Sequence, residues 1–389
     1  MDIDLIRRQT KGCSNKIFLN SAGSSMVPDE VTAIMVDYLN EEAITGGYAL
    51  AAKREAEIDQ FYTEAAILLN CSPDNIAYTT SATDSYARAL TAIDFKNGDV
   101  ILTTDDDYVS NQLAFLSLKH RYGVQVIRAN NLPDGDLDLD SFEKLVKQHH
   151  PKLVALTHIP TNSGLIQPAE QVGKICRQYD ILYLLDACQS VGQMNVDVKK
   201  TGCDFLTTTG RKFLRGPRGT GLLYISDRVL ATDMVPLIFD MRGSSWTGPD
   251  TYELFGTSKR FELWESSYAG KLGFAVALKY LNAVGITDIE QYNTELMKQF
   301  RTKLEQVKGL KLHDRGSRLS SILTFTTENR SLEQTAQLLR DNGVYFSTSP
   351  RTAAVIDFGK KNLDAVLRFS PHYFNTVEEL EKVVTILAD

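Results

Sequence analysis

An acid and a lysine follow two strand-like runs in the middle of the chain. Asp186 ends an apolar run from Ile181 to Leu185, and Lys212 follows the next such run. Open α/β sheets bind ligands outside the carboxyl ends of their strands, so both side chains are expected at that edge of a parallel sheet. Gln189 lies three residues after Asp186, and the Gly and Pro residues of RGPRGTG (215–221) predict a tight turn nearby.

This pair fits one kind of cofactor chemistry. A carboxylate against a pyridine nitrogen keeps that nitrogen protonated and makes the ring an electron sink. A lysine between small and hydroxyl residues can form a Schiff base with the aldehyde of the same cofactor. Both properties point to pyridoxal 5′-phosphate (PLP). A helix-capping Asp186 and a surface Lys212 are the simpler interpretation of either residue alone, but their order and the RGPRGTG turn favour PLP.

Two segments, DACQSVG (186–192) and TGRKFLRGPRGTG (209–221), resemble the class V aminotransferase-fold PLP enzymes. That family includes cysteine desulfurases, selenocysteine lyases, ergothioneine-pathway C–S lyases and isopenicillin N epimerases, and the resemblance runs from about Asn20 to the C-terminus. It implies an α/β protein of PLP fold type I, in which helices sandwich a mostly parallel seven-stranded sheet. The large PLP-binding domain is expected at residues 16–258, and a smaller α/β domain at residues 1–15 and 259–389. A homodimer with sites near the subunit interface is also implied.

The resemblance assigns roles around the ring of PLP. Lys212 becomes the catalytic lysine, Asp186 the partner of the pyridine nitrogen, and Gln189 the hydrogen-bond partner of the phenolic oxygen. Tyr108 stands where desulfurases usually carry a histidine stacked on the ring. A tyrosine can stack through its π face, but it is a poor proton shuttle near neutral pH, so this residue is more similar to the lyase and epimerase branches.

The phosphate of PLP is expected at the start of a helix. A strand near Ile76–Thr80, a small-hydroxyl turn and a helix N-terminus form a ready anion site. The family binds phosphate at this turn, which implies Ala82 and Thr83 as ligands, although a plain helix cap has the same pattern. Thr209 and Arg211 match positions that often contact the phosphate, and Arg211 is a permanent cation.

The substrate contacts come from two other segments. Arg368, in LRFSPHYFNT (367–376), matches the arginine that grips the α-carboxylate with a two-pronged hydrogen-bonded pair. The family's asparagine beside the cofactor falls on Thr161 or Asn162, a register that the sequence leaves open, and Asn162 is our assignment. Residues 240–262 are expected to form a glycine-rich active-site loop. Asp105 and Asp106 are expected in a solvated loop.

Cysteine positions bear on the subclass. Desulfurases that form a protein persulfide carry a cysteine on the loop before the arginine segment, but residues 347–354 have none, and no cysteine follows Cys203. Ser or Thr cannot replace a thiolate without an activating base. Persulfide formation on this loop is therefore disfavoured, and the loop resembles the ergothioneine-pathway lyases. Cys188 is expected to pack in the core.

Composition excludes several other classes. The chain is 43% apolar and 23% charged with a net charge of −7, and it has no Lys/Arg run of the kind that tracks nucleic acid. No apolar stretch spans a bilayer, and the N-terminus lacks the pattern of a secretory signal. Five cysteines without a CxxC pair predict a cytoplasmic protein. The only close histidine pair, His149–His150, does not share a helix face, so no metal site is predicted.

We therefore predict a PLP-dependent lyase that cleaves the C–S bond of a cysteine-type amino acid by β-elimination, without a loop-cysteine persulfide. An aminotransferase or an amino-acid epimerase of the same family could use the same residues. The epimerase would need a second acid/base, for which Tyr108 and His158 are the nearby candidates. A non-catalytic PLP-binding protein would have no physical reason to keep Lys212, Asp186 and Arg368 together.

Overall fold

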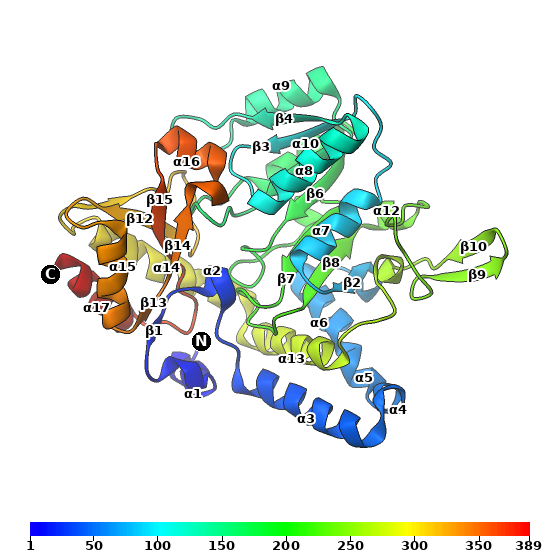
Figure 1. Cartoon of the computed structure of the whole chain (residues 1–389), viewed down its shortest axis with the longest axis horizontal. Coiled ribbons are helices and arrows are strands. Elements are labelled where there is room, and N and C mark those ends of the chain that lie inside the picture. Colours follow the sequence, from blue (N-terminus) through cyan, green and yellow to red (C-terminus); the bar gives the residue numbers. More distant parts are fainter.

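The computed structural model describes all residues, 1–389, and its centre is a seven-stranded sheet (Figure 1). The strand order is β2 (Ile76–Thr79), β8 (Gly221–Ile225), β7 (Phe205–Thr209), β6 (Leu182–Asp186), β5 (Leu153–Thr157), β3 (Val100–Thr104), β4 (Gln125–Ala129). The five strands from β7 to β4 are parallel, and β8 runs antiparallel to both of its neighbours. The predicted mostly parallel seven-stranded sheet is confirmed.

Helices cover both faces of this sheet because successive side chains of a strand point to opposite sides. Leu184 of β6 packs with one apolar cluster and Leu185 with the other. The Leu184 face is covered by α7 (Ala82–Thr91), α8 (Val109–Tyr122) and α12 (Asp227–Leu230). The Leu185 face is covered by α6 (Gln60–Leu69), α9 (Leu139–His149), α10 (Ala169–Gln178) and α13 (Tyr268–Val284). The buried strands are apolar on both faces, as their uninterrupted runs predict.

The remaining helices of the N-terminal segment are α1 (Ile3–Arg8), α2 (Ser21–Ser24), α3 (Asp29–Thr45), α4 (Gly47–Lys53) and α5 (Glu55–Ile58). The short α11 (Val198–Thr201) lies between β6 and β7 along the chain. Single 3₁₀ turns lie at Lys11–Cys13, Pro73–Asn75, Ser258–Phe261 and Arg351–Ala353. α3 packs along α13, and Figure 1 shows the two helices side by side below the sheet.

A second, antiparallel sheet forms the C-terminal part of the molecule. Its order is β11 (Leu310–Leu312), β12 (Leu323–Thr327), β15 (Ala365–Phe369), β14 (Ser347–Pro350). Its core is completed by α14 (Ile286–Leu304), α15 (Leu332–Asp341) and α17 (Val377–Ala388), with α16 (Val355–Lys361) facing the larger sheet. β1 (Ile17–Phe18) pairs in parallel with β13 (Val344–Tyr345), which joins the N-terminal segment to this part. The division at residues 16–258 stays a prediction.

Part of the predicted glycine-rich loop at 240–262 is instead an antiparallel hairpin, so that prediction is wrong there. β9 (Ser244–Gly248) pairs with β10 (Thr251–Leu254), because threonine and aromatic residues favour strands on either side of the Pro249–Asp250 turn. Figure 1 shows this hairpin arm projecting beyond the rest of the molecule. Trp246 and Tyr252 on it are 81% and 53% exposed.

None of the helices alone combines the length and the apolar character of a membrane span. The adjoining helices α13 and α14 would do so only as a pair, and the chain bends by 74° between them.

A buried ionic cluster fixes the base of the hairpin arm to the sheet. The Glu262 carboxylate, 2% exposed, accepts hydrogen bonds from the Tyr62 hydroxyl at 2.8 Å and the Tyr78 N–H at 2.8 Å. Arg242 donates to it at 2.9 Å, and the Lys271 ammonium lies 3.9 Å away. One carboxylate therefore joins α6, β2, α13 and the start of the arm.

We expect Glu262→Gln to lower the free energy of unfolding by about 3 kcal/mol, because it leaves two buried or half-buried cations without their counter-ion. Chemical denaturation measures this change. The matched control is Glu253→Gln on the exposed face of β10, which should change the free energy by less than about 0.5 kcal/mol. Equal effects of the two substitutions would contradict the assigned role of the cluster.

Candidate active site

Most of the predicted site residues lie at or after the carboxyl ends of β2, β3, β5, β6 and β7, while Arg368 comes from β15 of the C-terminal sheet. Asp186, the last residue of β6, is buried. Its Oδ1 accepts the N–H of Cys188 at 3.0 Å, and its Oδ2 accepts the side-chain amide of Asn111 at 2.9 Å. Each carboxylate oxygen has two acceptor positions, so this carboxylate can still accept a proton donor from a bound ring.

Lys212 follows β7 by three residues and is 7% exposed. Its ammonium makes no hydrogen bond or ion pair with the chain, and it lies 5.7 Å from the centre of the Tyr108 ring. Burial lowers the pKa of Lys212, and the cations Arg211 and Arg368 act in the same direction, while Cys188 and Asp186 oppose them. A lower pKa raises the share of the free amine, which is the nucleophilic form.

Gln189 follows Asp186 by three residues, and its side chain faces the N-terminal segment. Its Nε2 donates to the Ala22 carbonyl at 3.2 Å and to the Thr161 hydroxyl at 2.8 Å, while its buried Oε1 has no partner. In this arrangement both N–H groups of Gln189 bind protein atoms. A cofactor oxygen would have to replace one of them.

Arg368, on β15, is a buried cation without an acidic partner in the chain. Its Nη1 donates to the Thr161 hydroxyl at 2.7 Å and carbonyl at 3.1 Å, and its Nη2 donates to Asn20 Oδ1 at 3.3 Å. Its buried Nε has no partner. Burial, with Arg211 nearby, lowers the pKa of Arg368 to about 10. A bound carboxylate would supply the missing counter-charge.

The structure separates the two candidates that the sequence left open. The Thr161 hydroxyl bridges Gln189 and Arg368, whereas the Asn162 amide donates to the Ala353 carbonyl at 3.0 Å. Thr161 therefore faces the cluster around Lys212, and Asn162 faces the loop before α16. Strand alternation could not show which of the two side chains faces the site, because the segment that contains them has no regular structure after β5.

The start of α7 offers free donors. The hydroxyl of Ser81, the N-cap residue, accepts the N–H of Asp84, but the N–H groups of Ala82 and Thr83 have no partner in the chain. Gly221 permits the close approach of β8 to this turn, because a Cβ there would lie 2.6 Å from the backbone carbon of Ser81. A ten-residue helix with free first-turn N–H groups suits an anion.

Thr209 and Arg211 bind other parts of the chain. The Thr209 hydroxyl donates to the Thr220 carbonyl at 3.1 Å, and the Arg211 guanidinium donates to the Gly23 carbonyl. Their predicted contact with a phosphate stays a prediction, and for Thr209 the only hydroxyl proton is already used.

Two side chains that hold the site were missed from the sequence. Asn20 accepts a hydrogen bond from Arg368, and Asn111 donates to Asp186. The signal for Asn111 was its place one turn into the helix after Tyr108, on the face that points to the strand ends. Asn20 begins a stretch, 20–25, that resembles the family's N-terminal substrate loop, but its contact with Arg368 was not predictable because Arg368 comes from β15 at the other end of the chain.

Two expectations about neighbouring residues need correction. Asp106 is 6% exposed and accepts the Asn131 amide at 2.6 Å, and burial together with Asp357 of α16 raises the pKa of Asp106 to about 7. Asp105 is paired with Lys360, so neither acid lies in a solvated loop. Cys188 does not pack in the core either, because it is half-buried and belongs to none of the apolar clusters.

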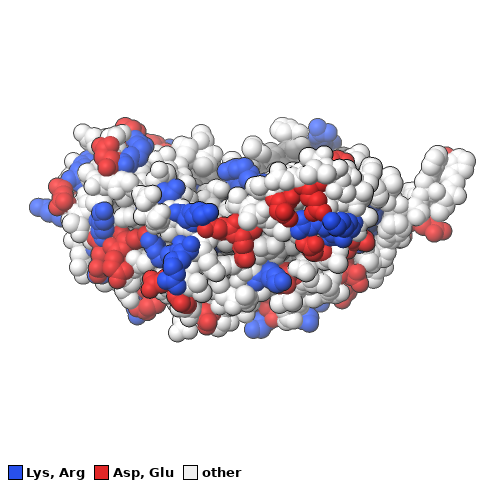
Figure 2. Space-filling view, turned by 90° about the horizontal axis from the view of Figure 1, so that it is seen from below, with Lys and Arg blue, Asp and Glu red and all other residues white.

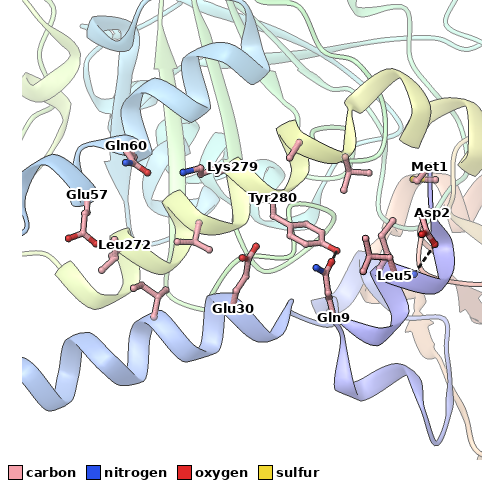
Figure 3. A pocket seen from close by; sticks show the side chains of 15 residues that line it. Met1, Asp2, Leu5, Gln9, Glu30, Glu57, Gln60, Leu272, Lys279 and Tyr280 are labelled. Atoms are coloured by element: carbon pink, nitrogen blue, oxygen red, sulfur yellow. Dashed lines mark hydrogen bonds between the residues drawn. The ribbon is translucent and has the colours of Figure 1, made fainter.

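A cavity with a volume of about 730 Å³ lies away from these residues, between α1, α3 and α13 (Figure 3). Three of its polar side chains are engaged in the structure: Asp2 caps α1, Gln9 accepts from Tyr280, and Glu57 pairs with Arg54. None of the residues around Lys212 lines it.

Comparisons with known proteins agree with this geometry. A family model described as Aminotransferase class-V matches residues 17–383. A probable cysteine desulfurase from Methanothermobacter thermautotrophicus is 27% identical over 97% of this chain and 95% of its own. The apo structure of a cysteine desulfurase from Thermococcus onnurineus superposes with a TM-score of 0.91 at 25% identity, covering 100% of this chain and 98% of that one. A cystine C–S lyase in complex with cysteine persulfide has a TM-score of 0.86 at 22% identity over 98% and 99% of the chains, a likeness of fold alone.

We expect acetate to raise the melting temperature of the cofactor-free protein by about 1–2 °C, because it supplies the anion that Arg368 lacks. Thermal melts in acetate and in chloride at equal ionic strength measure this. The rise should vanish in Arg368→Met and persist in Arg121→Met, which removes an exposed arginine on α8. An equal rise in all three proteins, or none in the wild type, would contradict the account of Arg368.

Proposed function

We propose that this chain, which belongs to the class V aminotransferase family, is a PLP-dependent carbon–sulfur lyase that acts on a cysteine-type amino acid by β-elimination. Family membership bears out the resemblance drawn from the DACQSVG and TGRKFLRGPRGTG segments. One observation carries the proposal for the reaction. Lys212, Asp186 and Arg368 converge on one strand edge, and the neighbouring loop at 347–354 has no thiol.

The family uses PLP, and the residues of this chain fit that cofactor. The buried Asp186 carboxylate can accept the ring N–H, the Lys212 amine has no partner in the chain, and the free N–H groups at Ala82 and Thr83 suit a phosphate. Tyr108 can lie against the ring, since it already faces the Lys212 amine. Arg211 adds a cation to the same region.

When bound, PLP withdraws electrons from the α-carbon of an amino acid that is joined to it. In our account Arg368 binds the α-carboxylate, with Thr161 orienting its guanidinium. The free Lys212 amine removes the proton from the α-carbon, and Asp186 keeps the ring nitrogen protonated. The C–S bond then breaks, and the elimination plus one water gives a thiol, pyruvate and ammonia.

The absence of a loop cysteine supports elimination over persulfide transfer. The relative from Methanothermobacter thermautotrophicus is named as a probable cysteine desulfurase, and such a reaction needs a nucleophilic thiolate. Cys188 is the cysteine on which the charges of Lys212 and Asp186 act, and burial raises the pKa of Cys188 to about 12. It is a protonated thiol at neutral pH, which makes it a poor persulfide acceptor.

The two alternatives of the same family gain less support. An epimerase needs a second acid/base, but burial lowers the pKa of His158 to about 4, which leaves that ring neutral and a weak base. An aminotransferase would convert a second keto acid and release no thiol. Both remain outcomes of the substrate test below.

We also propose a homodimer in a reducing, cytoplasmic setting. All five cysteines are unpaired, as expected in a reducing compartment. The hairpin arm and the segment before it expose large apolar side chains, and Figure 2 shows the arm extending from the body with mostly uncharged atoms. Two strands alone are marginally stable in water, so a second copy of the chain is the partner that would bury them.

The substrate test adds L-cysteine, a cysteine S-conjugate and its sulfoxide to the PLP-loaded protein and assays pyruvate and thiol release. We expect pyruvate from at least one of them. Lys212→Ala should lower that rate by about 10²–10⁴-fold, because it removes the base. The matched control is Lys174→Ala, an exposed lysine on α10, which should keep the rate. PLP binding without pyruvate, but with keto-acid conversion or α-proton exchange, would contradict the lyase assignment.

Light scattering after size exclusion tests the dimer. We expect a dimer for the wild type and a shift towards monomer for Trp246→Asp on the hairpin arm, because a buried carboxylate would lack a partner. The control is Ile67→Asp, which charges an apolar residue on α6 that is 66% exposed. A wild-type monomer, or a dimer unaffected by Trp246→Asp, would contradict the proposed interface.

A further inference from the structure

A chain of hydrogen bonds lies behind Asp186, on the side away from the open site. The Asn111 amide nitrogen lies 2.9 Å from Asp186 Oδ2, 3.1 Å from Asp107 Oδ1 and 3.3 Å from Thr157 Oγ1. Asn111 is 4% exposed. A second carboxylate therefore stands one amide away from Asp186.

The orientation of the Asn111 amide follows from its neighbours. Its NH₂ group has two protons and its oxygen has none, and carboxylates stand on both sides of it. Only the NH₂ group can face both, since the amide oxygen would meet lone pairs. Asp107 thus determines which end of Asn111 reaches Asp186.

Asp107 is itself held by several donors. Its Oδ1 accepts the Tyr108 N–H at 2.7 Å and the Thr157 hydroxyl, and its Oδ2 accepts the Thr103 hydroxyl at 3.0 Å and the Gln112 amide at 2.7 Å. With Asn111 this makes five donors to one carboxylate, which favours the ionised form against the effect of burial, which raises the pKa of Asp107.

The same carboxylate also fixes the residue that faces Lys212. Tyr108 is the N-cap of α8, and its backbone N–H is bound to Asp107. Asp107 therefore acts on two sides of the space beside Lys212: through Asn111 on the Asp186 carboxylate, and through the backbone on the position of the Tyr108 ring.

We propose that Asp107 and Asn111 are positioning residues that keep the Asp186 carboxylate aimed at the ring nitrogen of the cofactor while they fix the Tyr108 ring beside it. This inference rests on the proposed function, in which Asp186 binds that nitrogen. Without the hydrogen bond from Asn111 the Asp186 carboxylate is no longer held in this orientation, and its hydrogen bond to the ring nitrogen would weaken.

The test uses the full-length protein with added PLP and compares the wild type with Asn111→Leu, which keeps the size of the side chain and removes the donor. We expect the dissociation constant for PLP to rise about tenfold or more, because one charge-assisted hydrogen bond to Asp186 is lost. The pH at which the absorbance of the bound cofactor changes should differ by at least about one unit from that of the wild type. Asp107→Asn should shift both quantities in the same direction.

Controls separate positioning from simple structural support. Asn282→Leu removes a matched amide on α13, which donates to the Glu64 carboxylate of α6 at 2.8 Å. This substitution should leave the PLP affinity and the pH profile unchanged. If Asn111→Leu does not fold, Asn111→Ser, which cannot reach both carboxylates, should show the same two shifts. A lower melting temperature with wild-type PLP affinity and pH profile would overturn the proposal. A wild type that binds no PLP would instead overturn the proposed function.

Discussion

The site depends on cations that are buried without anions. Lys212 and Arg368 are 7% and 6% exposed, and neither has a carboxylate partner in the chain. Removing a charge from water is costly unless a counter-charge or several hydrogen bonds replace the solvent. The chain supplies neutral acceptors to Arg368, namely Thr161 and Asn20, and leaves the charge itself to a ligand. This part of the structure is therefore arranged for anions that the protein does not contain.

The supporting structure is drawn from distant parts of the sequence. Asp186, Thr161 and Lys212 follow strands of the large sheet, while Arg368 comes from the C-terminal sheet and Asn20 from the segment beside β1. The pairing of β1 with β13 brings the N-terminal segment to the C-terminal sheet. A carboxylate bound to Arg368 would therefore contact residues that both sheets position. The relative position of the two sheets then determines the size of the space for the substrate.

Much of this arrangement could be predicted from the sequence, for a physical reason. Asp186 and Lys212 follow continuous apolar runs, and parallel strands place their carboxyl ends at one edge, so their meeting required no knowledge of loops. The choice between Thr161 and Asn162 could not be made, because irregular backbone has no side-chain period. The burial of Asp106 was also hidden, since it is created by Asn131 and by Asp357 of α16, which are remote in sequence. The sequence predicts a loop for the hairpin arm because its glycines favour irregular backbone and its two strands are short.

The proposed activity requires that Lys212 bind PLP at the edge of the sheet beside Asp186. Borohydride reduction of the PLP-loaded protein, followed by proteolysis and mass spectrometry, identifies the lysine that carries the cofactor. We expect the reduced cofactor on the peptide containing Lys212 and on no other lysine. Attachment at another lysine, or no attachment after full loading with PLP, would contradict it.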